Sequence, residues 1–367
     1  MITLHLARSA SLVELGGRAA LFSESCQTLF ELNAPAKAAA LRLTQGISYH
    51  GLVASLIEAG ADEAPAAQSA RALIVRWSQA GLVSAECAPA PEKAHHHIPL
   101  SIVGMRVDVQ VDDARCRDLI TSSFGKLARH EGQPIGTYRI RDADSLALIS
   151  RDGKPTRIVE WSQFIPTLKA CLIDDILHAT PRIALHTACL VRDGRCLLLS
   201  GAPGAGKSTL AVALAQAGFG YVADDVTLLT EGGLAQGLPF HPTLKVGAWK
   251  LLPDHRNEID RSPIHQRLDG EQVRYLSLPT PPGADALPVG WIALLRRQKD
   301  ATATLEAVDV VRVLSELLGG AYSRSGRING QELKMMITMV SAARCFELRY
   351  SALKDAVDLL ESACGNI

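Results

Sequence analysis

One stretch of the chain has the residue types and the spacing of a phosphate-binding loop. Residues 201–208 read Gly-Ala-Pro-Gly-Ala-Gly-Lys-Ser. Glycines let successive backbone N–H groups curl around phosphate oxygens, and the positive end of a following helix adds to their field. In such loops the lysine reaches the β- and γ-phosphates and the hydroxyl binds Mg²⁺. The sequence therefore predicts a nucleoside triphosphate site in which Lys207 and Ser208 have these two roles.

The residues on both sides supply the context that this loop needs. An apolar strand is expected at Cys196–Ser200, and a helix at Thr209–Gln216 that Gly218 closes. A strand, a loop and a helix in this order predict a phosphate-loop core. The predicted nucleotide-binding residues are Gly201, Ala202, Pro203, Gly204, Ala205, Gly206, Lys207, Ser208 and Thr209.

Two adjacent carboxylates follow the helix. Asp224 and Asp225 interrupt the apolar, β-branched run 220–229, where a strand that ends beside the phosphate loop is expected. Two neighbouring aspartates allow two roles, because one can hold Mg²⁺ and the other can accept a proton from an attacking hydroxyl. The doublet favours a transferase or a phosphorylase, and the alternative is a solvated strand end.

From the loop to the aspartates, the sequence resembles the catalytic core of bacterial HPr serine kinase/phosphorylase and its relatives. Lys207 and Asp224 are 17 positions apart, the separation expected in that family. Residues 184–191 resemble the strand that carries the family's active-site histidine. The predicted mechanism has Asp224 take the hydroxyl proton, while Asp225 and Ser208 bind the metal. The resemblance implies that His186 sits near the transferred phosphate and assists Asp224. Without it, a lone histidine on a strand is more often a bystander.

Downstream, the sequence departs from that family. The signature of an acidic residue followed by Arg-Gly-Leu-Gly is absent, which argues against the HPr carrier protein as substrate. The change resembles divergent HPr-kinase-like proteins found with ribosomally made peptides, including lasso-peptide kinases. Lys245 and Arg274 occupy places where cations recur in those proteins, and Arg324 lies on an expected loop. Each could neutralise or clamp a phosphate, or be a surface charge.

The first 86 residues are expected to form a small winged-helix-like α+β domain. Extended pieces surround a Gly16-Gly17 turn, helices are expected near 34–43, 50–58 and 66–79, and a short strand near 81–84. This pattern resembles PqqD-type domains, which bind the leader of a precursor peptide, often as an added strand. The alternative is a winged helix for dimerisation or DNA binding, although few Lys or Arg lie in 34–80.

Residues 87–97 read as a linker, in which His95–His97 are expected to be solvated rather than to bind a metal. Residues 98–180 form a β-rich intermediate region that ends in a helix at Pro166–Ala179. Residues 181–367 form the catalytic domain. The expected fold class is an α/β phosphate-loop kinase core of the HPr kinase C-terminal type, preceded by the winged-helix-like domain and the β-rich region.

The composition limits the kinds of binding partner and the cellular compartment that are expected. The 38 basic and 38 acidic residues balance, so the chain has no general attraction to nucleic acid or an anionic membrane. The eight cysteines show no Cys-x-x-Cys pair and several lie in apolar runs, as expected of reduced core residues. No secretory signal or membrane helix is recognised, so a cytoplasmic protein is expected.

Together these features predict Mg²⁺-dependent phosphoryl transfer from ATP to a serine or threonine of a precursor peptide that the N-terminal domain recruits. Two other classes fit the same residues. One is an ATP-hydrolysing peptide chaperone or binding module, and the other is a small-molecule kinase in which residues 1–86 only set the oligomer. A homo-oligomer is expected only by resemblance to the kinase family.

Overall fold

The computed structural model of the chain describes residues 2–60, 62–87, 96–124, 132–279 and 286–365. The predicted linker lies mostly outside the described residues, and so does His95. The chain divides into two compact units. The first contains Met1–Pro99, Val107–Leu119 and Gly136–Leu168, and the second contains Leu100–Arg106, Ile120–Ile135 and Lys169–Ile367.

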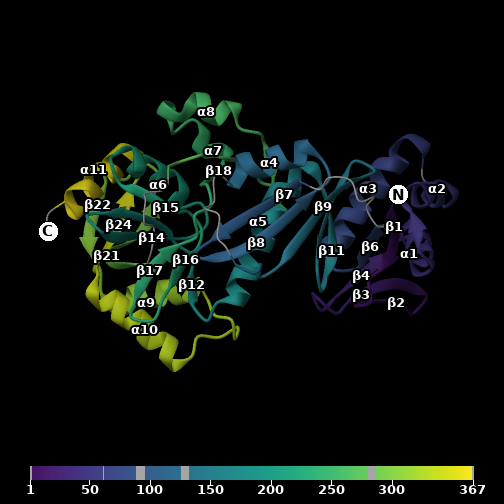
Figure 1. The fold of residues 1–367 in the computed structure, drawn as a ribbon, viewed down its shortest axis with the longest axis horizontal. Helices are drawn as coiled ribbons and strands as arrows, with labels where there is room; N and C mark the ends of the chain where they lie inside the picture. Colours follow the sequence, from purple (N-terminus) through teal and green to yellow (C-terminus); the bar gives the residue numbers. More distant parts are fainter. Residues whose placement is uncertain (1, 61, 88–95, 125–131, 280–285, 366–367) are drawn as a thin grey trace. The chain divides into compact units, whose positions relative to one another are not determined.

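The N-terminal part of the first unit consists of two small sheets and three helices (Figure 1). One sheet has the order β5-β1-β6 and the other the order β2-β3-β4, and all pairs are antiparallel. The elements are β1 (Ile2–Leu6), β2 (Ala10–Leu15), β3 (Arg18–Ser23), β4 (Thr28–Leu32), α1 (Ala34–Gln45), β5 (Ile47–Ser48), α2 (Tyr49–Glu58), α3 (Glu63–Gln79) and β6 (Val83–Cys87).

The three helices lie close to their predicted positions. The Asn33 side chain caps α1 by accepting a hydrogen bond from the Ala36 N–H at 3.0 Å, and Gly46 follows the helix with a φ of 82°. Strand β4 was not expected. Its residues are mostly exposed or half-buried, because it forms one edge of its sheet, so its sequence lacks the alternation that marks a strand with one buried face.

The β-rich region of the chain forms a five-stranded sheet with the order β11-β10-β9-β8-β7. The pair β8–β9 is parallel, while β9–β10 and β10–β11 are antiparallel. Leu146 and Leu148 of this sheet share a hydrophobic core with residues of the N-terminal part, such as Leu52 and Ile74. The elements are β7 (His96–Ile102), β8 (Met105–Val111), α4 (Ala114–Phe124), β9 (Thr137–Ala143), β10 (Leu146–Arg151) and β11 (Lys154–Glu160).

Helix α5 (Trp161–Ala179) begins five residues before the predicted start at Pro166. Pro166 has no backbone N–H, so the carbonyl four residues earlier would lack its hydrogen-bond partner in a helix. The sequence therefore favours a helix that starts at Pro166. The buried apolar face, however, extends back to Phe164, whose ring packs against Trp161 with centroids 5.2 Å apart. Packing therefore extends the helix past the proline. The boundary between the two units falls inside α5, after Leu168.

The second unit is built on a ten-stranded mixed sheet (Figure 1). Strand β21 is its centre: it pairs in parallel with β14 and β24, while its first residues pair antiparallel with β17. The strands are β12 (Ile183–Leu185), β13 (Ala188–Arg192), β14 (Arg195–Ser200), β15 (Gly220–Ala223), β16 (Thr227–Leu229), β17 (Leu234–Gly237), β21 (Leu287–Arg297), β22 (Thr304–Ala307), β23 (Ala321–Tyr322) and β24 (Arg344–Tyr350).

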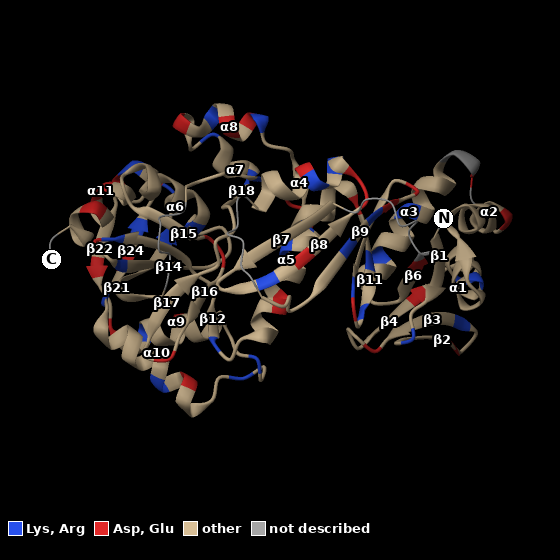
Figure 2. Ribbon diagram, in the orientation of Figure 1, with Lys and Arg blue, Asp and Glu red and all other residues tan. Residues whose placement is uncertain are grey.

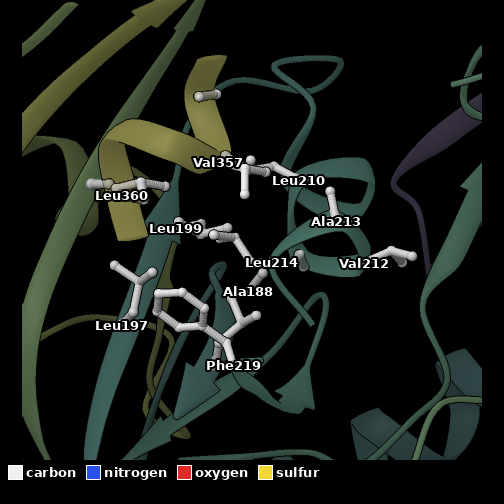
Figure 3. Close-up of a cluster of buried hydrophobic side chains, with 14 of the residues drawn as sticks. Ala188, Leu197, Leu199, Leu210, Val212, Ala213, Leu214, Phe219, Val357 and Leu360 are labelled. Carbon is white, nitrogen blue, oxygen red and sulfur yellow. The ribbon is translucent and has the colours of Figure 1, made fainter. Parts of the chain in front are cut away.

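Helices cover both faces of this sheet. On one face, Leu210 and Leu214 of α6 pack with Val357 and Leu360 of α11 against Leu199 of β14 (Figure 3). A second cluster, which includes residues of α9 and α10, covers the other face. The helices are α6 (Lys207–Gln216), α9 (Val310–Gly319), α10 (Gly330–Ala342) and α11 (Leu353–Cys364), and α6 begins two residues before its predicted start at Thr209.

A separate three-stranded sheet with the order β18-β20-β19 belongs to the second unit. Its elements and neighbours are β18 (Thr243–Lys245), α7 (Val246–Trp249), η1 (Pro253–His255), α8 (Arg256–Arg261), β19 (His265–Gln266) and β20 (Gln272–Tyr275). Basic and acidic residues occur together on many elements, α8 among them (Figure 2). Among the described residues, no helix combines the length and the apolar character needed to cross a bilayer.

Candidate active site

The loop at 201–206 lies between the end of β14 and the start of α6. Ala202, Pro203 and Gly204 are exposed, whereas Lys207 and Thr209 at the start of the helix are buried. Because β14, β21 and β24 run parallel, the loop follows the carboxyl end of a central strand, where ligands of open α/β sheets bind.

The last strand of the sheet holds the loop in place. The Tyr350 hydroxyl, from the end of β24, donates a hydrogen bond to the Ala205 carbonyl at 2.7 Å. Gly206 has a φ of 94°, and a Cβ added there would lie 2.4 Å from the Tyr350 oxygen. Glycine is therefore required at 206 for its backbone conformation and for this close approach.

Lys207 is folded back onto the loop. Its Nζ donates to the Gly201 carbonyl, at the start of the loop, at 2.7 Å. Burial lowers the pKa of Lys207, against the negative charges of Asp225 and Asp224, which act to raise it. The lysine and both aspartates are thus close enough to act on one another electrostatically.

Asp224 and Asp225 lie in the bend between β15 and β16. Asp224 is 1% exposed, and its Oδ2 accepts a hydrogen bond from the Thr243 N–H at 2.8 Å. Its Oδ1 is buried and has no hydrogen-bond partner among the described residues. Burial, followed by the charge of Asp225, raises the pKa of Asp224 to about 7, although Lys169, Thr243 and the Ser208 side chain act in the opposite direction.

Asp225 is more accessible and has a cationic partner. Its Oδ2 accepts a hydrogen bond from the Lys169 Nζ at 2.9 Å, and its side chain is 34% exposed. Burial acts to raise the pKa of Asp225, but the charge and hydrogen bond of Lys169, with His186 and Arg267, outweigh it and lower the pKa. Two neighbouring carboxylates are therefore in different electrostatic environments.

The strand expected at 184–191 is interrupted at His186. β12 ends at Leu185 and pairs with β16, whereas β13 begins at Ala188 and pairs with β14. His186 lies at this crossover, exposed, with Nδ1 3.1 Å from the Asp225 backbone oxygen. A carbonyl only accepts, so Nδ1 donates the hydrogen in this contact, and Nε2 is the acceptor of that tautomer.

Lys169 is a member of this cluster that the sequence analysis missed. It lies in the middle of α5, is 6% exposed, and donates both to Asp225 and to the Thr243 Oγ1 at 2.8 Å. Its Nζ also lies 5.7 Å from the Phe240 ring centre and 5.6 Å from that of Tyr275. The sequence predicts a helix here but not the burial of Lys169, because a lysine beside an apolar stripe usually faces solvent.

Three predicted phosphate contacts have other partners or an exposed position. Lys245 forms an ion pair with Glu271 at 3.3 Å. The Arg274 guanidinium stacks over the Trp249 ring at 4.6 Å and contacts α8. Arg324 is exposed in the turn after β23. The structure thus brings His186, Lys207, Ser208 and the two aspartates together by hydrogen bonds or electrostatic effects. In the described part of the chain, the contacts of Lys245 and Arg274 are to other groups, and Arg324 is exposed.

The cluster has the donor groups that suit Mg²⁺ bound to a nucleotide. Mg²⁺ in such sites takes one or two carboxylates, while waters and phosphate oxygens complete its shell. Ser208 and the aspartates supply hard oxygen donors, and the orphaned Oδ1 of Asp224 has capacity for a partner. No group of three or more His, Cys, Asp or Glu suited to a metal occurs in the described ranges, so a protein-only metal cage is not seen there.

Comparisons with known proteins do not establish a function for this chain. No protein-family model matches the chain. A search of curated proteins gives no match. Among solved structures, the Hpr(Ser) kinase/phosphatase from Coxiella burnetii is similar over 50% of this chain and 94% of that chain, with 14% identity and a TM-score of 0.21. A likeness at that level establishes neither a shared fold nor a shared activity.

Proposed function

We propose that this chain is a Mg²⁺-dependent phosphotransferase that moves the γ-phosphoryl group of ATP to a serine or threonine hydroxyl of a peptide. One observation carries the proposal: the end of β14 and the bend after β15 bring Lys207 and Ser208 of a glycine-rich loop beside Asp224 and Asp225. A phosphate cradle next to a carboxylate pair provides both the binding and the proton transfer that this reaction needs.

Binding and positioning are assigned to the loop. Its backbone N–H groups and the start of α6 face the phosphates, and Lys207 exchanges the Gly201 carbonyl for phosphate oxygens. Ser208 and Asp225 would hold Mg²⁺, which supplies charge neutralisation at the transferred group.

Asp224 is assigned the proton transfer, because its unpartnered Oδ1 can accept a hydrogen bond from an acceptor hydroxyl. As the hydroxyl oxygen forms a bond to the γ-phosphorus, the bond from that phosphorus to the bridging oxygen breaks and ADP leaves. The hydroxyl proton moves to Asp224. His186, whose Nδ1 is held by the Asp225 backbone oxygen, would use Nε2 to orient the approaching hydroxyl from the exposed side.

A groove in the first unit supports recruitment of a peptide. It has a volume of about 500 Å³ and lies between β4, α1 and α3. In the described part of its sheet, β4 is an edge strand, to which an extended peptide can add. Because the groove and the loop belong to one chain, a bound peptide reaches the loop at high effective concentration. The lining residues are Leu29, Phe30, Glu31, Leu32, Asn33, Ala36, Leu73, Arg76 and Trp77.

The test is a phosphate-transfer assay with purified protein, Mg²⁺, γ-labelled ATP and candidate precursor peptides encoded near its gene. Mass spectrometry locates the phosphate on the peptide. A phosphopeptide that disappears with Lys207→Ala supports the proposal. ATP consumption without a labelled peptide would favour the chaperone or the small-molecule kinase instead, and absence of ATP turnover would contradict a phosphotransferase.

A further inference from the structure

Lys169 is a buried cation that the proposed mechanism does not yet use. Its ammonium group has three N–H donors, of which Asp225 Oδ2 and Thr243 Oγ1 take two. Thr243 in turn donates its backbone N–H to Asp224 Oδ2 at 2.8 Å. One lysine and one threonine thus connect the two adjacent carboxylates in a closed network, drawn from α5, β18 and the bend after β15.

The surroundings of the ammonium group leave it little freedom. Lys169 is 6% exposed. Its Nζ lies 5.7 Å from the Phe240 ring centre and 5.6 Å from the Tyr275 ring centre, and both distances are within the range of a cation–π contact. In the described part of the chain, the acidic groups that act on it are Asp225, which accepts its hydrogen bond, and Asp224. A buried lysine held in this way has a fixed position relative to both carboxylates.

We propose that Lys169 is a positioning residue that fixes the orientation of the Asp224–Asp225 pair for phosphoryl transfer. The inference rests on the proposed function. Lys169 holds one oxygen of Asp225 and leaves the other toward the metal side, while Thr243, anchored by the same ammonium group, holds one oxygen of Asp224 and leaves Oδ1 for the acceptor.

Such a role differs from a purely structural one in what its loss should change. Removing one partner of a buried ion pair is destabilising chiefly because the other charge is left buried without compensation. Asp225 is one-third exposed and can recover its lost hydrogen bond from water. Without Lys169 the fold should therefore persist, but the carboxylates would lose their common anchor. Small errors in the position of catalytic groups reduce turnover steeply.

The experiment compares Lys169→Met, Thr243→Val and wild type in the full chain. Thr243→Val removes the hydroxyl that accepts from Lys169 and keeps the N–H that holds Asp224. Lys354→Met is the matched control, since Lys354 also pairs with an aspartate, Asp358, but on the exposed surface of α11. For each protein, kcat and KM for Mg·ATP, the Mg²⁺ concentration for half-maximal rate and the melting temperature are measured.

We expect Lys169→Met to lower kcat about a hundredfold while KM for Mg·ATP changes less than about threefold. Thr243→Val should lower kcat about tenfold, and Lys354→Met should match wild type. The Mg²⁺ requirement of Lys169→Met should rise, because Asp225 is no longer held in place. A structural role would instead lower the melting temperature and leave kcat per folded molecule unchanged.

Unchanged kcat and Mg²⁺ requirement in both Lys169→Met and Thr243→Val would overturn the positioning role while leaving the proposed function intact. If Lys169→Met does not fold, Thr243→Val decides alone. A wild-type protein that neither hydrolyses nor transfers the γ-phosphate would contradict the proposed function, and the role of Lys169 with it. The two failures are therefore distinguished by the wild-type rate.

Discussion

The aspartate site of the second unit and the groove of the first unit differ in how far their polar groups are buried. At the aspartate site, Asp224 and Lys169 are almost fully buried, and their partners come from distant parts of the sequence. In the groove, Arg76 and Glu31 are exposed and Leu29 is 54% exposed on an edge strand. The aspartate site thus holds a few polar atoms in fixed positions, whereas the groove leaves backbone and side-chain groups exposed to solvent.

This difference follows from what each site is proposed to do. Phosphoryl transfer needs groups that are positioned before the substrate arrives, in surroundings that exclude water. Strand addition needs unpaired backbone groups and tolerates varied side chains, because the main chain supplies most of the hydrogen bonds. Substitutions at the aspartate site should therefore act on turnover, and substitutions in the groove should act on peptide affinity.

The largest effect is expected for Asp224→Asn. The amide cannot accept the hydroxyl proton, so kcat for peptide phosphorylation should fall about a thousandfold, within the usual range for loss of a general base. Nucleotide binding, followed by titration calorimetry with a nonhydrolysable ATP analogue, should persist. Transfer at the wild-type rate would show that Asp224 is not the proton acceptor.

Acid should destabilise the second unit through its buried histidines. Burial lowers the pKa of His265 to about 4, so this side chain binds a proton more readily in the unfolded chain, with its ordinary pKa of 6.5. Its stabilising contribution is complete above pH 6.5 and falls as the pH drops toward 4, by about 2 kcal/mol at pH 5. His265→Gln should flatten this dependence in denaturant titrations, and the exposed control His178→Gln should not.

A charge reversal in the groove should separate recruitment from chemistry. Arg76→Glu changes the charge of an exposed lining residue, and we expect about tenfold weaker binding of an acidic leader peptide, as measured by fluorescence anisotropy. Peptide-independent ATP hydrolysis should be unaffected. Arg42→Glu, on the exposed surface of α1 and outside the groove lining, is the control. Equal binding by both variants would argue against the groove as the peptide site.

The smallest effect is expected for Tyr350→Phe, which removes one hydrogen bond to the loop and leaves the ring in place. A single hydrogen bond contributes about 1 kcal/mol, so nucleotide affinity should weaken about fivefold. The effect should appear in Kd for the nucleotide rather than in peptide binding. A change confined to peptide binding would mean that Tyr350 does not organise the loop.

Local signals in the sequence predicted the elements on both sides of the phosphate-binding loop. The strand expected at Cys196–Ser200 is present as β14, and the helix expected at Thr209–Gln216 is present as α6, which begins two residues earlier. These elements depend on residues that are neighbours in sequence, such as an apolar run in a strand or apolar residues one helical turn apart.

The parts that could not be predicted depend on residues far apart in the chain. Lys169 meets Asp225 across 56 positions and Thr243 across 74, and no local pattern encodes either contact. The break at His186 arises because β12 and β13 pair with different strands of the sheet. The early start of α5 results from packing of Phe164 and Trp161. Tertiary contacts decide each of these features.

The bond from Tyr350 to Ala205 joins residues 145 positions apart, and it has a consequence for the order of folding during synthesis. β14 and α6 leave the ribosome early, but their parallel neighbours β21 and β24 follow only much later. Domains generally form as their chain emerges, from the N-terminus onward. The groove of the first unit can therefore be complete, and able to hold a peptide, while the nascent chain still lacks a finished loop for ATP.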